Sequence, residues 1–401
     1  MPDDTTALPG DLARPDAAGG DLTPNSPLGA DGGVGNGGGS RGRHVGRAWW
    51  KSPWAIAGAA ALVVLGGVGI ALAVTSGGTK AKVAAPTTTV APTTTKAPAP
   101  ACPLNGGPSP SGSVPQRPAL AVKVDNYPDA RPQSGLDEAD IIFEEPVEGG
   151  ITRYVAVFQC RDAAQVGPIR STRYPDSGIL EQLSKPIFIH VGGIDPIVGM
   201  LTQAQSQGLL FDFNFFYDAS IIQHVPGRNA PFNIYVSTAD AWKSQPKDTN
   251  PPAPVFTYSA TAPAGTTTAS VHIPFSPTSD ENWTWNPTGG VWMLAYSGIQ
   301  ATLLGGGPVG MTNVVIQSVQ TSYGPWLENS AYNSNEIEVN ALSGGTVTVL
   351  RNGVAVTGKW TRASLTAPIV LVAADGSPIP LAPGPTWVAM VPSQIPVTPT
   401  P

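Results

Sequence analysis

The chain has 401 residues, of which 46 are Gly and 43 are Pro, so more than a fifth of it consists of the two residue types least suited to helix interiors. This composition excludes a compact all-helical globule. The 22 basic and 28 acidic side chains give a net charge of −6, and the part beyond residue 102 holds 14 basic and 22 acidic ones. This acidic balance argues against nonspecific nucleic-acid or teichoic-acid binding through a basic surface.

The N-terminal segment predicts a tail followed by a membrane anchor. Residues 1–50 include the run DGGVGNGGGS from Asp31, too poor in apolar side chains to fold, and we expect a disordered cytoplasmic tail. The run from Ala55 to Val74 carries no charge, and as a helix it would span roughly 30 Å. Basic residues precede it, so we expect a single transmembrane helix over residues 53–75, with the remaining chain outside the plasma membrane.

A cleavable signal peptide is the alternative to this anchor. The apolar run ends with Ala71-Leu72-Ala73, a small–x–small pattern that a signal peptidase accepts. The long preceding segment favours the uncleaved helix. With either ending, the C-terminal part of the chain is exported.

The composition divides the exported part into segments. Residues 76–101 are rich in Pro and Thr and predict an extended stalk. Aromatic and β-branched residues begin near Cys102, so we expect an α+β domain over residues 102–245 and a β-rich domain over residues 255–392, separated by a Pro-rich break. The Pro/Thr-rich residues 393–401 predict a disordered end.

The first domain should hold a mixed sheet with flanking helices. Enrichment in β-branched and aromatic residues predicts strands over residues 121–126, 140–146, 152–160, 186–193 and 232–238, and helices over residues 176–186 and 197–208. The second domain should hold strands over residues 255–259, 269–276, 282–287, 291–298, 312–323, 346–362, 368–375 and 386–392. Asn352-Gly353 predicts a tight hairpin turn.

Charge is concentrated in one stretch of the first domain. Residues 125–173 carry 14 of the 50 charged side chains, and every basic residue among them is Arg. The planar guanidinium suits bidentate pairing with carboxylates or phosphates. Two interpretations remain open, namely structural ion pairs around the sheet and a polar pocket in which Arg and carboxylate side chains converge on a ligand.

The acids and hydroxyls of this stretch offer several weaker hypotheses. Asp140 and Glu144 alternate onto one face of a predicted strand, where they could bind a hard cation or divide acid and base roles. Ser134 and Ser171 match no nucleophile motif. His190 is the best general-base candidate. No metal-ligand spacing or phosphate-binding loop occurs, so we predict neither a metal site nor a cofactor.

The amino-acid sequence of this segment resembles that of a known protein family. The run DNYPDARPQSGLDEADIIFEEPVEGGITRYVAVF from Asp125, followed by VGPIRSTR, FIHVGG and NAPFNIYVS, is similar to the YerB-like family of bacterial lipoproteins, a domain of unknown function. The runs GGTVTVLRNGVAVTGKWTR and DGSPIPLAPGPTWVAMVP resemble that family's C-terminal domain. The resemblance implies an envelope protein without an established activity.

The family motif maps onto a set of polar residues, most of which we take as candidate ligand-binding positions. These candidates are Asp125, Asn126, Arg131, Gln133, Asp140, Glu144, Glu148, Arg153, Arg170, Ser171, Arg173 and His190, and the motif also includes Ser134 and Thr152. The chain departs from the family in its anchor, because Cys102 follows Pro-Ala-Pro-Ala far beyond the apolar run and forms no lipidation motif. The transmembrane helix would take over that role.

Cys102 and Cys160 are the only cysteines of the chain. An even pair in an exported protein predicts a disulfide, here between the stalk junction and the end of a strand. A catalytic thiol at Cys160 is the alternative.

Three functional hypotheses follow. The first is an envelope binding or scaffold protein whose polar pocket holds a cell-wall or other envelope ligand. The second is a hydrolase or transferase acting on a cell-wall glycan or peptide, with Asp140, Glu144 or Glu148 as acid and base. The third is a purely structural module. The first two require Glu144, Glu148, Arg153, Arg170 and Arg173 to line one pocket, whereas scattered ion pairs favour the third.

Overall fold

The computed structural model describes residues 99–216, 218–244, 250–329 and 333–401. The predicted cytoplasmic tail, the predicted transmembrane helix from Ala55 to Val74 and nearly all of the stalk lie outside these residues. Among the described residues, no helix is both long and apolar enough to cross a membrane. They all belong to one compact unit, Val90–Pro401.

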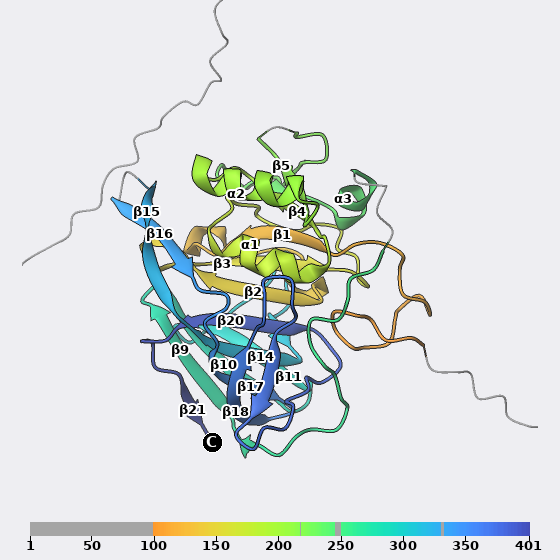
Figure 1. Ribbon diagram of the computed structural model, residues 1–401, viewed down its shortest axis with the longest axis vertical. Coiled ribbons are helices and arrows are strands. Elements are labelled where there is room, and N and C mark those ends of the chain that lie inside the picture. The colour runs from red at the N-terminus through yellow and green to blue at the C-terminus, as the bar shows by residue number, and fades with distance from the viewer. Residues whose placement is uncertain (1–98, 217, 245–249, 330–332) are drawn as a thin grey trace, which may run out of the picture. The chain divides into compact units, whose positions relative to one another are not determined.

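The larger sheet is mixed and has eleven strands (Figure 1). Ten of them follow the order β19-β18-β17-β14-β20-β2-β3-β1-β4-β5, and β8 pairs with β18. Their bounds are β1 Leu120–Asp125, β2 Ile141–Pro146, β3 Thr152–Phe158, β4 Ile187–His190, β5 Phe211–Asn214, β8 Thr266–Thr267, β14 Asn313–Val319, β17 Gly345–Arg351, β18 Val354–Thr361, β19 Val370–Ala373 and β20 Thr386–Pro392.

Strand β20 joins the two halves of the sequence. It runs parallel to β2 on one side and to β14 on the other, with Trp387 level with Ile142 and Val314. Every residue of β20 is buried, which fits its unbroken apolar sequence and its place at the middle of the sheet. The mixed α+β architecture expected from the sequence is therefore present, but strands from both predicted domains share one sheet.

The second sheet is antiparallel and comes from the C-terminal half. It contains β9 Ser270–Ser276, β10 Ser279–Asn286, β11 Val291–Tyr296, β12 Ile299–Gln300, β13 Gly310–Met311 and β21 Thr398–Thr400. Strand β21 pairs with β9. The prediction of a disordered end over residues 393–401 is thus wrong for residues 398–400, because the edge of β9 offers backbone partners to the β-branched threonines.

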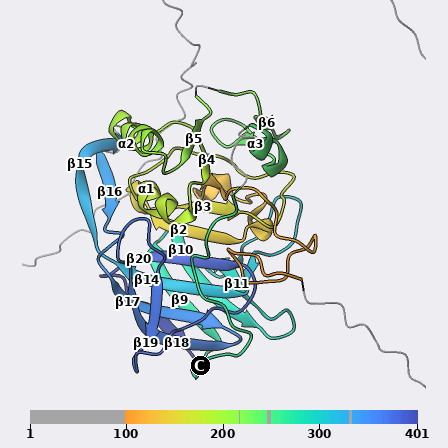
Figure 2. The same ribbon diagram turned by 45° about the vertical axis from the view of Figure 1, so that its right-hand side comes forward.

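The larger sheet is buried on both faces, and alternate side chains enter two different cores. On one face Ile142, Tyr154 and Trp387 pack with Trp283 and Trp292 of the second sheet. The opposite face carries Phe143, Val155 and Phe188 and is covered by helices α1 Pro175–Leu180 and α2 Asp195–Ser206 (Figure 2). A third helix, α3 Thr238–Ser244, contacts β1, and its Ala241 and Trp242 join the first of these cores.

The remaining strands form two antiparallel pairs, β6 Gln223–His224 with β7 Ile234–Tyr235, and β15 Thr321–Asn329 with β16 Ser334–Val339. Four 3-10 helices, Pro128–Ala130, Leu136–Glu138, Glu148–Gly150 and Glu181–Leu183, complete the described elements. Helix α3 and strands β5, β6, β8, β12, β13, β16 and β21 were not predicted. The predicted strand at 255–259 is wrong, since only Tyr258 forms a single bridge there. Asn352 and Gly353 make the expected turn between β17 and β18, with φ of 50° and 76°.

Candidate functional site

A cleft of about 600 Å³ opens where β1 ends and β3 begins. These strands are antiparallel, and Asp125 at the end of β1 stands level with Arg153 in β3. This register therefore brings the run that begins at Asp125 beside the run that contains Arg153. The lining residues are Asp125, Tyr127, Glu148, Gly149, Ile151, Arg153, Arg170, Phe232, Thr278 and Ser334.

Glu148 of the cleft lining forms a bidentate ion pair with Arg173, which was expected to line the pocket but is not among its lining residues. Nε of Arg173 lies 2.8 Å from Oε2 of Glu148, and its Nη2 contacts Oε1. Burial alone would raise the pKa of Glu148, but the hydrogen bonds and positive charges of Arg173 and Arg153 outweigh it and lower the pKa to about 2. Glu148 is therefore a firmly ionised carboxylate.

Arg173 has a second partner on the β15–β16 hairpin. Its Nη1 lies 2.7 Å from Oε1 of Glu328. Burial raises the pKa of Glu328 to about 7, although the charge of Arg173 opposes the change. At neutral pH this carboxyl group carries only part of a negative charge, so Glu148 supplies most of the compensation for Arg173.

Arg153 is the poorly compensated cation of the cleft. Its side chain is only 5% exposed, yet its Nε lies 4.0 Å from Asp125 and its Nη2 lies 3.8 Å from Glu148. Its Nη1 donates to the carbonyl of Ser171 at 3.2 Å, and its Nε has no hydrogen-bond partner among the described residues. Burial, followed by the charge of Arg173, lowers the pKa of Arg153 to about 10. A buried charge without close partners is costly, so this guanidinium is suited to receive an anion.

Arg170 lies nearer the solvent. Its Nε is 3.0 Å from Oδ2 of Asp125, and its side chain is 31% exposed. The same carboxylate accepts the backbone N–H of Tyr127 at 3.0 Å. Asp125 therefore fixes both Arg170 and the loop after β1.

Glu144, which was expected to join this cluster, lies elsewhere. It is fully buried between the two sheets, where its Oε2 accepts the indole N–H of Trp387 at 2.8 Å. Glu281 of β10 faces it and accepts the indole N–H of Trp283 at 3.3 Å. Burial raises the pKa of both carboxyl groups, and in Glu281 the charge of Glu144 adds to the effect. The expectation that Glu144 would line the polar pocket is therefore wrong.

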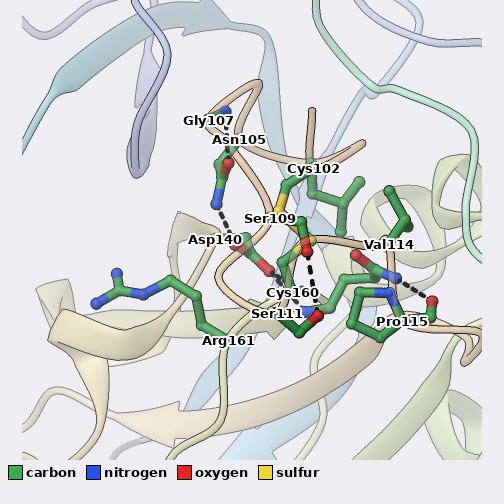
Figure 3. The surroundings of a disulfide bond; sticks show 12 residues. Cys102, Asn105, Gly107, Ser109, Ser111, Val114, Pro115, Asp140, Cys160 and Arg161 are labelled. Atoms are coloured by element: carbon green, nitrogen blue, oxygen red, sulfur yellow. Dashed lines mark hydrogen bonds between the residues drawn. A yellow bond between two sulfur atoms is a disulfide. The ribbon is translucent and has the colours of Figure 1, made fainter. Parts of the chain in front are cut away.

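Asp140 is also remote from the cleft. Its carboxylate accepts hydrogen bonds from the side chain of Asn105 at 2.5 Å and from the backbone N–H of Gln159 at 2.6 Å (Figure 3). Burial raises its pKa to about 6, against these hydrogen bonds. Asp140 and Glu144 share a strand face as expected, but each is enclosed by its own partners, so they form neither a cation site nor an acid–base pair.

A disulfide joins Cys102 to Cys160 beside Asp140 (Figure 3). The Cα atoms are 6.0 Å apart, and the linked residues are 58 positions apart in sequence. The bond ties the start of the described chain to the end of β3. In this state Cys160 has no thiol for the catalytic role considered from the sequence.

Three further motif residues form a network around Asn126 behind the cleft. The Oδ1 atom of Asn126 accepts from Arg131 and from Gln133, both at 2.9 Å, and its Nδ2 donates to Thr152 at 2.7 Å. Arg131 also stacks on the ring of Tyr296, with its guanidinium carbon 3.5 Å from the ring centroid. This network holds the loop after β1 against the second sheet.

His190 and Ser171 lie outside the cleft lining. His190 is fully buried, and its two ring nitrogens lie 2.8 Å from the carbonyl of Gly192 and 2.8 Å from Asp212. It ties β4 to β5, which is a structural role and not that of the general base considered from the sequence. Ser171 reaches the site only through its carbonyl group. Sequence reasoning missed Tyr127, Phe232, Thr278 and Glu328. Tyr127 and Phe232 lie within the runs that resemble the family, but they are not among its polar positions.

Comparison with known proteins defines the class to which this fold and site belong. The model "Protein of unknown function (DUF3048) N-terminal domain" matches residues 104–250, and the corresponding C-terminal domain matches residues 271–388. The chain belongs to this family, as its motifs predicted.

Individual relatives agree with that assignment. The "Putative lipoprotein YerB" of Bacillus subtilis (strain 168) is 28% identical over 290 residues, which cover 70% of this chain and 82% of the relative. The crystal structure of YerB protein from Bacillus subtilis matches with a TM-score of 0.62 and 25% identity, covering 74% of this chain and 99% of that one.

Proposed function

We propose that this protein is a membrane-anchored, extracytoplasmic binding protein of the cell envelope whose cleft receives an anionic envelope ligand. The name of the Bacillus relative as a lipoprotein supports an envelope location. The apolar run from Ala55 to Val74, with basic residues before it, supports anchoring by a helix with the N-terminus in the cytoplasm.

The binding proposal rests on Arg153, a buried guanidinium without a close ionic partner. Arg173 is neutralised by Glu148 at bonding distance, and Arg170 by Asp125. Arg153 stands between these pairs with no ionic contact shorter than 3.8 Å. An anion entering the cleft would supply the missing partner, and its binding would be strengthened by the low exposure of the site.

The environments of the acidic residues considered for a hydrolase or transferase favour ligand binding over general acid catalysis. Asp140 and Glu144 are fully buried away from the cleft. Glu148 faces the cleft, but with a pKa near 2 it holds no proton to donate at neutral pH.

A titration of the purified protein with acidic fragments of a cell-wall digest tests the proposal. We expect Arg153→Gln to weaken binding at least about tenfold, which corresponds to about 1.4 kcal/mol. The matched control is Arg161→Gln, because Arg161 pairs with Glu138 at 2.8 Å on the surface outside the cleft. Equal binding by wild type and a folded Arg153→Gln variant would overturn the proposal.

A further inference from the structure

Two aromatic rings lie beside the arginines of the cleft. Tyr127 and Phe232 stack with ring centroids 6.2 Å apart and planes 3° apart. Tyr127 is 42% exposed, although large aromatic side chains are usually covered. Both rings line the same cleft as Arg153 and Arg170. The hydrophobic cores do not account for this pair, so its position at a polar cleft requires a separate explanation.

The rings are held in a fixed relation to the charged groups. The backbone N–H of Tyr127 donates to the Asp125 carboxylate, which also pairs with Arg170. Phe232 lies in a turn closed by its own backbone N–H, which donates to the carbonyl of Asn229 at 2.8 Å. Asp125 therefore couples the aromatic surface to the arginines, and a ligand that contacts both would meet a prepared arrangement.

We propose that the cleft binds a sugar ring that carries a single negative group. The inference rests on the proposed anion-binding function and names its ligand class. The apolar C–H face of the ring packs on Tyr127 and Phe232, and its carboxylate or phosphodiester group pairs with Arg153 and Arg170. Aromatic rings provide rigid apolar area at low entropic cost, which suits a ligand with one apolar face and polar edges.

The two carboxylates of the cleft restrict the number of negative groups on this ligand. Asp125 and Glu148 are acceptors, and a ligand hydroxyl could donate to either of them. The same two carboxylates repel a second negative group, so one anion among neutral hydroxyls fits better than a polyanion. A cleft of about 600 Å³ is larger than a lone carboxylate needs and lies within the range of small-molecule sites.

The experiment is a calorimetric titration of the full-length protein in detergent with defined probes. Glucuronate and N-acetylmuramate carry a ring and a carboxylate, and a methyl glucosyl phosphodiester carries a ring and a phosphate. Glucose supplies the neutral ring, acetate supplies the anion without a ring, and benzoate supplies a competing aromatic anion without a sugar. We expect at least one sugar acid or the phosphodiester to bind about tenfold more tightly than acetate, glucose and benzoate. The strongest binder identifies the source of the negative group.

Two variants separate the parts of the site. Tyr127→Ala should remove the advantage of the sugar acid over acetate, because the exposed ring supplies the apolar contact with the sugar and contributes no charge. Arg170→Gln should weaken acetate and the sugar acid alike. Their melting temperatures, compared with that of Arg161→Gln, establish that both variants remain folded.

The outcomes distinguish the two proposals. Acetate binding as tightly as every sugar acid and the phosphodiester, or unchanged sugar-acid affinity in Tyr127→Ala, overturns the sugar inference and leaves the anion proposal standing. Preference for benzoate also overturns it. If no anionic probe binds and the digest fragments do not bind either, both proposals fail.

Discussion

Glu144 and Glu148 are four residues apart, but they lie in different environments, and their pKa values shift in opposite directions. Glu144 lies with Glu281 in a sealed space between the sheets, where burial raises the pKa of both groups. Glu148 lies in the open cleft, where Arg173 and Arg153 help to lower its pKa to about 2. The strand ends between them, and the turn through Gly149, with φ of 76°, redirects the chain. The acidity of a side chain thus depends on the neighbours that the fold provides.

The aromatic residues of the two regions also differ, in their exposure to solvent. Trp387 packs edge-on against Tyr154 and Trp283, with centroids 4.8 and 5.2 Å away, and none of these rings reaches solvent. Tyr127 in the cleft keeps 42% of its surface exposed. We therefore assign the sealed region to stability and the open region to binding.

The largest expected effect lies in the sealed region. Trp387→Ala should lower the free energy of unfolding by about 3–5 kcal/mol, because it leaves a cavity and removes the donor to Glu144. Tyr127→Ala is the matched aromatic change in the cleft and should cost no more than about 0.5 kcal/mol. Urea unfolding of both variants measures the contrast, and equal losses would contradict the division between the regions.

The second largest effect is expected from breaking the ion pair between Glu148 and Arg173. Arg173→Met leaves Glu148 buried without its bidentate partner and should destabilise the protein by about 3 kcal/mol. It should also raise the pKa of Glu148. The same unfolding series measures the first effect, and carboxyl NMR titration measures the second. A Glu148 pKa unchanged by the substitution would refute the assigned cause.

The sealed pair should make stability fall as pH rises. Below about pH 4.5 the pair is protonated in both the folded and unfolded states, whereas above it the unfolded state releases a proton that the folded state retains. Each proton retained costs about 1.4 kcal/mol per pH unit, up to the raised pKa. Glu281→Gln should flatten this slope when unfolding is compared at about pH 5 and about pH 7. Glu145, with a pKa of about 8, maintains part of the slope in the variant.

The smallest effect has the opposite sign. Arg153→Met removes a buried charge whose nearest ionic contact is 3.8 Å away, so the free energy of unfolding should rise by about 1 kcal/mol. A binding residue kept at a cost to stability behaves in this way. A loss of about 2 kcal/mol instead would mean that Arg153 is structural.

Local patterns predicted much of the fold, and long-range pairing accounts for most of the differences. The Asn352-Gly353 turn and the strands around Asp125, Glu144 and Arg153 follow from propensity and alternation. The insertion of β20 between β2 and β14 does not, because one apolar run resembles another until its partners are known. Strand β21 depends on the edge of β9 in the same way.

The site was predictable to the extent that its residues belong to neighbouring strands. The density of Arg and carboxylates pointed to Asp125, Glu148, Arg153 and Arg170, which the antiparallel register of β1 and β3 brings together. Glu281 could not be paired with Glu144 from sequence, because the two are 137 positions apart and meet only when the sheets pack. A half-buried aromatic such as Phe232 carries no local signal of a binding role.

The most direct test of the central claim is a titration of the acidic wall fragments into wild type and Arg153→Met. Wild type should bind, and the variant should lose binding at least about tenfold while melting no lower than wild type. Equal affinity for the fragments in the two proteins would contradict the central claim.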